Sequence, residues 1–319
     1  MIRTAKTLLV TTSIALGAIA HAQTWPDQPI RWVVPYPAGG GTDVVARSVA
    51  GVIEKSLKQT IIIENRPGAG TSIGATTVAR AEPKGYVVGT ADSGTLAFNP
   101  ALYSKLTYDP ATFTYIGGLA RFPLMLAVRY DSPLKSVEDV LAAAKEKPLS
   151  VSSAGAGSPH HLAMELFKQR TGADLLHVPY QGAAPAIQDL IGGQVDMMFI
   201  DGGSGLPNVR AGKLRVLATA TPDRLAAVPD APTMIEMGYS GFTAYAWQGL
   251  VGPAGMPADV VAKLNMELVA ALQTPALVER ITNMGVELMP MSSEEFKAYA
   301  EKERALWADV IDKAGIKLN

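Results

Sequence analysis

Four short segments of small and polar residues have the composition needed to bind an anion. Each directly follows an apolar run typical of a buried β-strand: PYPAGGGTD from Pro35, DSGT from Asp92, SAGAGSPHH from Ser153 and DGGS from Asp201. Glycines allow several backbone amides to converge on one ligand, and the N-terminus of a helix adds positive potential. Because the segments supply few cations, this pattern favours a small carboxylate held by amides and hydroxyls over a polyphosphate.

Two of the four segments are expected to lead directly into a helix. The first precedes an apolar periodicity over residues 43–58, with Thr42 or Asp43 as the capping residue. The second precedes a helix over residues 159–169, with Ser158 as N-cap and Pro159 at the first helical position. For any single segment, a tight turn that requires glycine is the alternative explanation. Four such segments at strand ends favour one shared ligand cleft.

Patterns that would indicate an enzyme are weak. The segment GTSIG from Gly70 matches the nucleophile elbow of serine hydrolases, but Ser72 does not directly follow the predicted strand and no histidine lies late in the chain. Gly68, Gly70 and Gly74 have the wrong spacing for a dinucleotide site, and no phosphate-binding P-loop motif occurs. The adjacent His160 and His161 do not have metal-ligand spacing. We expect no enzymatic activity, no cofactor and no metal, and serine hydrolase remains the third alternative.

Other polar residues near the predicted strand ends have both structural and functional interpretations. Asp43 is either a helix-start charge or a cleft residue, and Asp196 is either a turn residue or a cleft residue. Asp201 directly follows an apolar strand, which favours a role in positioning a ligand or a loop. Tyr36 and Tyr180 lie among Pro and Gly residues, where each either forms a wall of the cleft or packs in the core.

The elements that must position these segments are predicted by an alternation of strand and helix patterns along the chain. This alternation is typical of βαβ units around a mostly parallel sheet. We expect two α/β lobes, formed by residues 23–121 with 247–319 and by residues 122–246, and a hinge where the chain crosses near 121–122 and 245–247. The predicted strands cover residues 30–34, 61–63, 86–91, 124–128, 149–152, 175–178, 195–200 and 215–220. The remaining predicted helices cover residues 137–145, 183–191 and 258–272. A last helix is predicted to begin at the capping box Ser292-x-x-Glu295 and to end at Gly315.

Composition and the N-terminal segment restrict the class of protein further. The 319 residues include 28 Lys and Arg against 29 Asp and Glu, which argues against nucleic-acid binding. The chain has no Cys, so it can form no disulfide, thiolate metal site, catalytic thiol or lipid-modified cysteine. Residues 1–22 combine Arg3 and Lys6 with an apolar run and the small-residue site Ala20-His21-Ala22, which predicts a cleaved signal peptide and export to the periplasm.

Several long segments of the sequence resemble the periplasmic substrate-binding receptors of tripartite tricarboxylate transporters, the Bug receptor family. The segments that carry the resemblance are WPDQPIRWVVPYPAGGGTDVVAR, IIIENRPGAGTSIGA, AFNPALY, AGAGSPHHLAMELF, HVPYQGAAPAIQDLIGGQVDMMF and PNVRAGKLRVLA. The resemblance implies a two-lobed, type II periplasmic binding protein fold (a Venus flytrap) that closes on its ligand, and partner subunits in the membrane. We expect two mixed sheets flanked by helices, joined by a two-segment hinge.

The resemblance also implies which residues bind the ligand. One carboxylate would be held between the two glycine segments, partly through ordered waters, and the other two segments would face the variable part of the ligand. The expected binding residues are Tyr36, Ala38, Gly40, Thr42, Asp43, Ser93, Thr95, Ala156, Gly157, Ser158, His161, Tyr180, Asp201 and Gly202. His161 is expected to donate a hydrogen bond toward the ligand.

The expected function is that of a monomeric extracytoplasmic receptor that captures a small organic carboxylate and delivers it to integral membrane transporter subunits. A dicarboxylate is the first expectation, and Tyr36, Tyr180 and the loop around Phe98 would allow an aromatic one. The main alternative is a periplasmic carboxylate receptor that reports to a membrane sensor.

Overall fold

The computed structural model describes residues 25–318, so the predicted signal peptide over residues 1–22 lies outside the described residues. The strands are β1 Ile30–Val34, β2 Ile61–Asn65, β3 Val87–Asp92, β4 Thr114–Arg129, β5 Leu149–Ser153, β6 Leu175–Pro179, β7 Met197–Asp201, β8 Leu214–Thr219, β9 Tyr245–Gly252 and β10 Glu287–Leu288. The helices are α1 Gly41–Leu57, α2 Ser72–Ala79, α3 Asn99–Leu102, α4 Val137–Glu146, α5 Pro159–Thr171, α6 Ala183–Ile191, α7 Gly202–Arg210, α8 Ala258–Leu272, α9 Pro275–Asn283 and α10 Ser293–Ala314, with short turns η1 Gly94–Phe98 and η2 Pro110–Thr112.

A single mixed sheet connects all of these strands, in the order β2-β1-β3-β9-β4-β7-β5-β6, and β10 and β8 also pair with β4. The expectation of two separate sheets is wrong because β4 is continuous. Its first part, Thr114 to Pro123, pairs with β9, and its second part, from Leu124 onward, pairs with β7 and β8. The sheet therefore curls through the whole molecule along one long strand.

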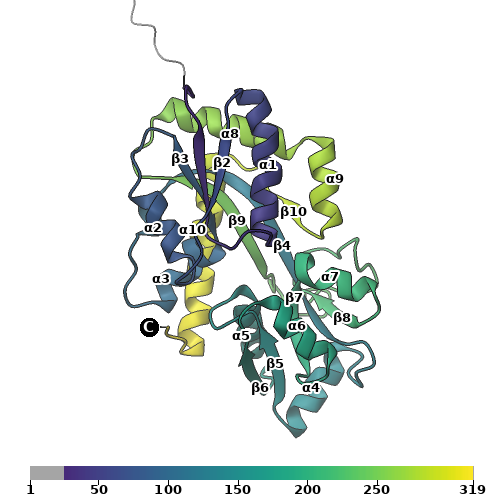
Figure 1. Cartoon of the computed structure of the whole chain (residues 1–319). Helices are drawn as coiled ribbons and strands as arrows, with labels where there is room; N and C mark the ends of the chain where they lie inside the picture. The colour runs from purple at the N-terminus through teal and green to yellow at the C-terminus, as the bar shows by residue number, and fades with distance from the viewer. Residues whose placement is uncertain (1–24, 319) are drawn as a thin grey trace, which may run out of the picture.

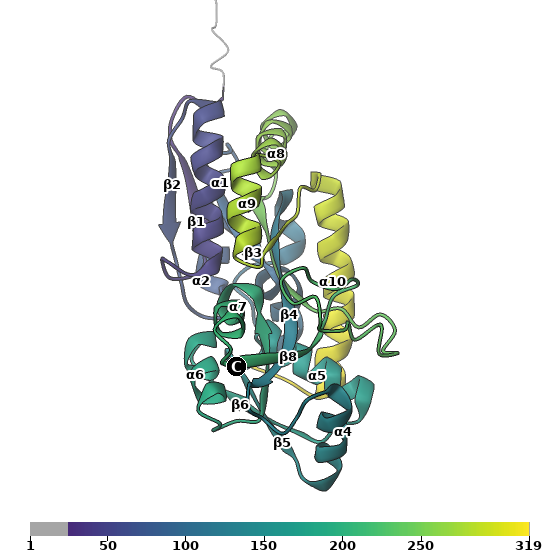
Figure 2. The same ribbon diagram turned by 90° about the vertical axis from the view of Figure 1, so that its right-hand side faces the viewer.

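The other elements form two groups at the two ends of β4 (Figure 1). We call β1–β3, β9 and β10 with α1–α3 and α8–α10 the upper group, and β5–β8 with α4–α7 the lower group. In the upper group, α1 packs on α8, and Val45, Val49 and Ile53 of α1 are buried in the same core as Trp32. On the other side of β4 from α1, α10 extends from the upper group down to α5 (Figure 2). There Gln169 Nε2 donates to Val310 O at 2.9 Å.

The two predicted crossing segments lie side by side as paired strands. Arg121 of β4 pairs with Trp247 of β9, and Phe122 pairs with Ala246, in antiparallel register. Both connections between the groups are therefore held in one hydrogen-bonded ribbon. No helix among residues 25–318 combines the length and apolar character needed to cross a bilayer.

Local sequence signals explain the ends of some helices. Helices α6 and α8 have the predicted bounds, the capping box at Ser292 and Glu295 starts α10, and Gly315 ends it in the left-handed conformation. Helix α1 differs, because it begins at Gly41 with Gly40 as N-cap and has no side-chain cap. The expected capping role of Thr42 or Asp43 is therefore wrong, and both residues lie in the first turn.

Candidate functional site

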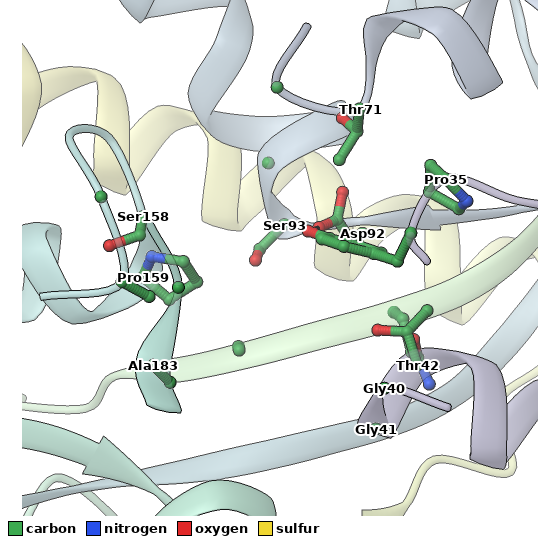
Figure 3. A pocket seen from close by; sticks show the side chains of 18 of the residues that line it. Pro35, Gly40, Gly41, Thr42, Thr71, Asp92, Ser93, Ser158, Pro159 and Ala183 are labelled. Carbon is green, nitrogen blue, oxygen red and sulfur yellow. Dashed lines mark hydrogen bonds between the residues drawn. The ribbon is translucent and has the colours of Figure 1, made fainter. Parts of the chain in front are cut away.

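All four segments that the sequence predicts to bind an anion meet at one cavity of about 770 Å³ between the two groups. Figure 3 shows Ser158 and Pro159 on one side of it and Gly40, Gly41 and Thr42 on the other. The first set starts α5 of the lower group, and the second starts α1 of the upper group. Two helix N-termini from different groups thus face the same space, where backbone amides and positive helix potential favour an anion.

Asp43 holds the glycine loop in front of α1. Its Oδ2 accepts from Gly39 N at 2.8 Å and from Arg47 Nε at 2.9 Å, and its Oδ1 accepts from Asn65 Nδ2 at 2.8 Å. Burial alone would raise the pKa of Asp43, but these hydrogen bonds and the Arg47 charge lower it below its usual value. Asp43 is buried and does not line the cavity, so it acts on the site through the loop.

The glycine loop in front of α5 is held by its own helix. Ser158 Oγ accepts from His161 N at 3.3 Å, which confirms the predicted N-cap, and Pro159 occupies the first helical position. The ring of His161 turns back, and its Nδ1 accepts from Gly157 N at 3.0 Å. His161 therefore fixes the loop and does not line the cavity. The Nδ1 atom that faces the loop is an acceptor, and not the donor toward a ligand that the sequence suggested.

A second histidine supports His161 from behind. The His177 ring stacks on the His161 ring at a centroid distance of 3.6 Å, and His177 Nε2 lies 2.6 Å from Ser153 Oγ. Burial and the neighbouring His161 lower the pKa of His177 to about 4. His177 is therefore neutral near pH 7 and provides a packed, uncharged support for the loop.

The end of β3 brings a buried carboxylate to the cavity. Asp92 Oδ2 accepts from Tyr36 Oη at 2.5 Å, and Asp92 Oδ1 accepts from Thr95 N at 2.8 Å. Burial and the adjacent Asp92 raise the pKa of Tyr36 well above its usual value, so Tyr36 remains a hydrogen-bond donor. Asp92 and Ser93 line the cavity between the two glycine loops (Figure 3).

The fourth segment continues into a helix that the sequence did not predict. Asp201 caps α7, with Oδ1 accepting from Ser204 N at 2.8 Å, and its Oδ2 accepts from His160 Nε2 at 3.0 Å. Burial would raise the pKa of Asp201, but the His160 and Ser204 hydrogen bonds and the His160 charge outweigh it and lower the pKa. Asp201 thus positions both the start of α7 and the ring of His160, and all three lie at the cavity.

The structure brings most of the predicted binding residues to this cavity, but not all of them. Tyr36, Gly40, Thr42, Ser93, Ala156, Gly157, Ser158 and Asp201 line it. Six do not: Ala38 is exposed, Asp43, Thr95, His161 and Gly202 are buried behind the lining, and Tyr180 donates to Asp189 Oδ2 at 2.6 Å. Ligand binding by the whole set remains a prediction.

Several lining residues were missed because they come from elements without a clear sequence signal. Ala246, Trp247 and Gln248 come from β9, Thr71 directly precedes α2, and Asn99 is the first residue of α3. The segment that forms β9 is the apolar run YAWQGLVG, and the single polar residue in it, Gln248, would have been the only local signal for a site residue there. Thr71 lies in the GTSIG segment, whose sequence matches a nucleophile elbow. Ser72 of this segment begins α2, and β2 already ends at Asn65, so no strand leads directly into Ser72 as an elbow requires.

The charges of the lining are unusual for the anion-binding site that the sequence predicts. Of the described residues that line the cavity, none is Lys or Arg, and the two acids are Asp92 and Asp201. His160 is the partner of Asp201. Attraction for a carboxylate must therefore come from the amides at the starts of α1, α5 and α7. No cluster of three or more potential metal ligands occurs within residues 25–318.

Comparisons with known proteins identify a family model and several solved structures that are similar to this chain. Residues 45–316 match the model of the tripartite tricarboxylate transporter family receptor. The solved structure of the periplasmic binding protein BugD has 36% sequence identity and a TM-score of 0.80, over 92% of this chain and 100% of that chain. MatC from Rhodopseudomonas palustris with bound malate has 34% identity and a TM-score of 0.79, over 90% and 100%. A second R. palustris protein, solved with adipate, has 34% identity and a TM-score of 0.84, over 92% and 100%.

Proposed function

The chain belongs to the tripartite tricarboxylate transporter receptor family, and on this basis we propose that it captures a small organic carboxylate between its upper and lower groups. Members of this family are binding receptors and not enzymes, so the cavity is a binding site. One observation carries the proposal: the glycine loops that start α1 and α5 come from different groups and line one cavity without Lys or Arg among its described residues. The ligand carboxylate bridges these two loops.

We propose that the upper and lower groups are the two lobes of a type II periplasmic binding fold, formed by residues 23–121 with 247–319 and by residues 122–246. The paired segments around Arg121 and Trp247 would be the hinge. The upper and lower groups approach each other closely at the edge of the cavity, which supports the proposal that this structure is the closed state. A Cβ added at Gly157 of the lower group would lie only 2.7 Å from Leu102 Cδ1 and 2.9 Å from Leu318 Cδ1 of the upper group. A ligand that touches both lobes favours this closed state through its differential affinity.

The proposed ligand class is a dicarboxylate, aliphatic or aromatic. The related structures solved with adipate and malate support a dicarboxylic acid. Tyr36 and Trp247 in the lining supply aromatic surface for a planar ligand. The family and its periplasmic relatives further support a periplasmic receptor that delivers its ligand to integral membrane transporter subunits. We propose that this receptor is a monomer and that the signal peptide over residues 1–22 exports it.

Thermal-shift titration of the mature protein with a panel of organic acids tests the proposal. A ligand at 100 times its Kd should stabilise the protein by about 2.7 kcal/mol. Ser158→Leu should abolish this shift, because the larger side chain fills the space in front of α5. Ser136→Leu is the matched control, since Ser136 is also an N-cap serine but lies outside the cavity. If no carboxylate raises the melting temperature, the receptor function is refuted.

A role in sensing is the second candidate, because capture and closure serve a transporter and a membrane sensor equally well. Uptake of the identified acid in cells that lack the partner membrane subunits separates the two. Transport predicts that uptake fails in these cells, whereas sensing predicts that uptake continues.

A further inference from the structure

Three polar residues form one corner of the cavity, which we call the Asp92 corner: Asp92, Ser93 and Gln248. The antiparallel register of β3 and β9 places Gln248 directly opposite Asp92. Residues opposite each other in such a pair project from the same face of the sheet, so both side chains point the same way. All three residues line the cavity, with only 7%, 1% and 1% of their surface exposed.

Ser93 and Gln248 are buried without hydrogen-bond partners. Neither Ser93 Oγ nor the amide oxygen and nitrogen of Gln248 has a partner among the described residues. Buried polar atoms without partners are costly, and they are rare in folded proteins. Because these three atoms belong to residues that line the cavity, a bound ligand is well placed to supply their partners.

Asp92 gives this corner a preference for donors over acceptors. Its carboxylate receives only neutral donors, from Tyr36 Oη at 2.5 Å and from Thr95 N and Oγ1 at 2.8 and 2.7 Å. A carboxylate has about four acceptor positions, so one more donor can be accommodated. No Lys or Arg lies among the described lining residues, and the other acid, Asp201, has His160 as its partner. A ligand carboxylate at this corner would meet a like charge, whereas an ammonium group would meet an opposite charge.

We propose that the Asp92 corner selects carboxylates that also carry a hydrogen-bond donor, an ammonium group first and a hydroxyl group second. This inference rests on the proposed function and narrows its ligand class. One carboxylate lies at the glycine loops of α1 and α5, and the substituent on the carbon chain donates to Asp92 and to Gln248 Oε1. Gln248 Nε2 and Ser93 Oγ bind the remaining oxygens of the ligand.

Calorimetric titration with acids of one carbon skeleton tests this selectivity. Succinate, malate and aspartate share four carbons and two carboxylates and differ only in carrying hydrogen, hydroxyl or ammonium at one carbon. Adipate and 2-aminoadipate form a longer pair. We expect aspartate to bind at least about tenfold more tightly than succinate, and 2-aminoadipate at least about tenfold more tightly than adipate. The affinity for malate should lie between those for succinate and aspartate.

The Asp92→Asn variant removes the charge with little change in shape. It should reduce the preference for aspartate over succinate by about tenfold, mainly by weakening aspartate binding. Asp309→Asn is the matched control, because it removes one acidic charge from an exposed i,i+4 pair on α10 and should leave the preference unchanged. The comparison of acids on the unmodified protein does not depend on the folding of either variant.

The outcomes separate this inference from the function on which it rests. Binding of none of these acids would refute the role of the Asp92 corner, and it would refute the receptor function as well only if the wider panel of organic acids also failed to bind. Equal affinities for succinate and aspartate in the unmodified protein, or a preference that persists in a folded Asp92→Asn variant, would refute the role of the Asp92 corner while leaving a carboxylate receptor in place.

Discussion

Closure of the two groups can be tested at Gly202, where they meet on the side of the cavity away from Gly157. Gly202 is the first residue of α7, and Gly285 lies in the turn that connects α9 to β10. A Cβ added at Gly202 would lie 2.1 Å from Gly285 O and 2.8 Å from Gly285 C. Both contacts are with backbone atoms, so no side-chain rotation can relieve them. Ala is otherwise well tolerated in the first turn of a helix.

The size of the effect follows from this overlap. Non-bonded heavy atoms pack best at about 3.5 Å, so the two groups must separate locally by about 1.4 Å to accept the Gly202→Ala side chain. Overpacking of this kind costs about 1–3 kcal/mol, which corresponds to about a 5- to 150-fold increase in Kd when the cost falls on the closed state. The ligand-free protein should lose little stability, because it can relieve the contact by opening.

Calorimetry and small-angle scattering measure the two consequences separately. We expect weaker binding of the carboxylate by Gly202→Ala and a larger radius of gyration of the ligand-saturated variant. Gly51→Ala is the matched control, since a Cβ added at Gly51 within α1 meets no atom within 4 Å. An unchanged Kd together with an unchanged radius of gyration would refute this prediction, because it would show that the two groups do not close through the contact between Gly202 and Gly285.

Two further predictions concern acid stability. Because hydrogen bonds from His160 and Ser204 lower the pKa of Asp201, its contribution to stability is present above pH 3.8 and is lost as the pH falls below that value. Asp201→Asn should therefore melt at a lower temperature than the unmodified protein at pH 7, and this difference should shrink in acid. Burial and His161 lower the pKa of His177 from 6.5 to about 4, so its contribution is full above pH 6.5 and is lost toward pH 4. The melting temperature of His177→Gln should fall less over that interval, and parallel curves for variant and unmodified protein would contradict the assigned shift.

The sequence predicts the elements whose periodicity and end signals agree. Helices α6 and α8 have apolar faces at helical spacing, and α10 has both a capping box and a terminal glycine, so their positions follow from local residues. Helix α7 was missed because it begins GGSG and contains Pro207, which resembles a loop. Its one clear signal is the Asp201 cap three residues before Ser204.

The long-range features of the sheet could not be predicted in the same way. The first part of β4 contains Gly117 and Gly118, which interrupt the apolar pattern, and these glycines are required by Asn265, Leu268 and Met289 packed against them. Local patterns therefore predict a strand only in the second part of β4, and the continuity of β4 that joins the strands into one sheet is not visible in the sequence. Similarly, Gln248 becomes a site residue only through its register with Asp92, which no local pattern reveals.

The candidate site shows the same division between local and long-range signals. The glycine segments and the Ser158 cap follow from strand ends and helix starts, which are local. The direction of the His161 ring depends on its contacts with Gly157 and His177, and His177 comes from a different strand. Residue types and spacing therefore identify the loops that form the cavity, while tertiary contacts decide which side chains reach it.

The position of β9 also has a consequence for how the chain folds. Strand β9 lies between β3 and β4, although all strands of the lower group precede it in sequence. During synthesis or export from the N-terminus, β3 and the first part of β4 therefore keep unpaired edges until β9 emerges, and such edges promote aggregation. The lower group has its strands in one continuous stretch and can fold earlier. We expect the N-terminal strands, which emerge first, to complete their sheet last.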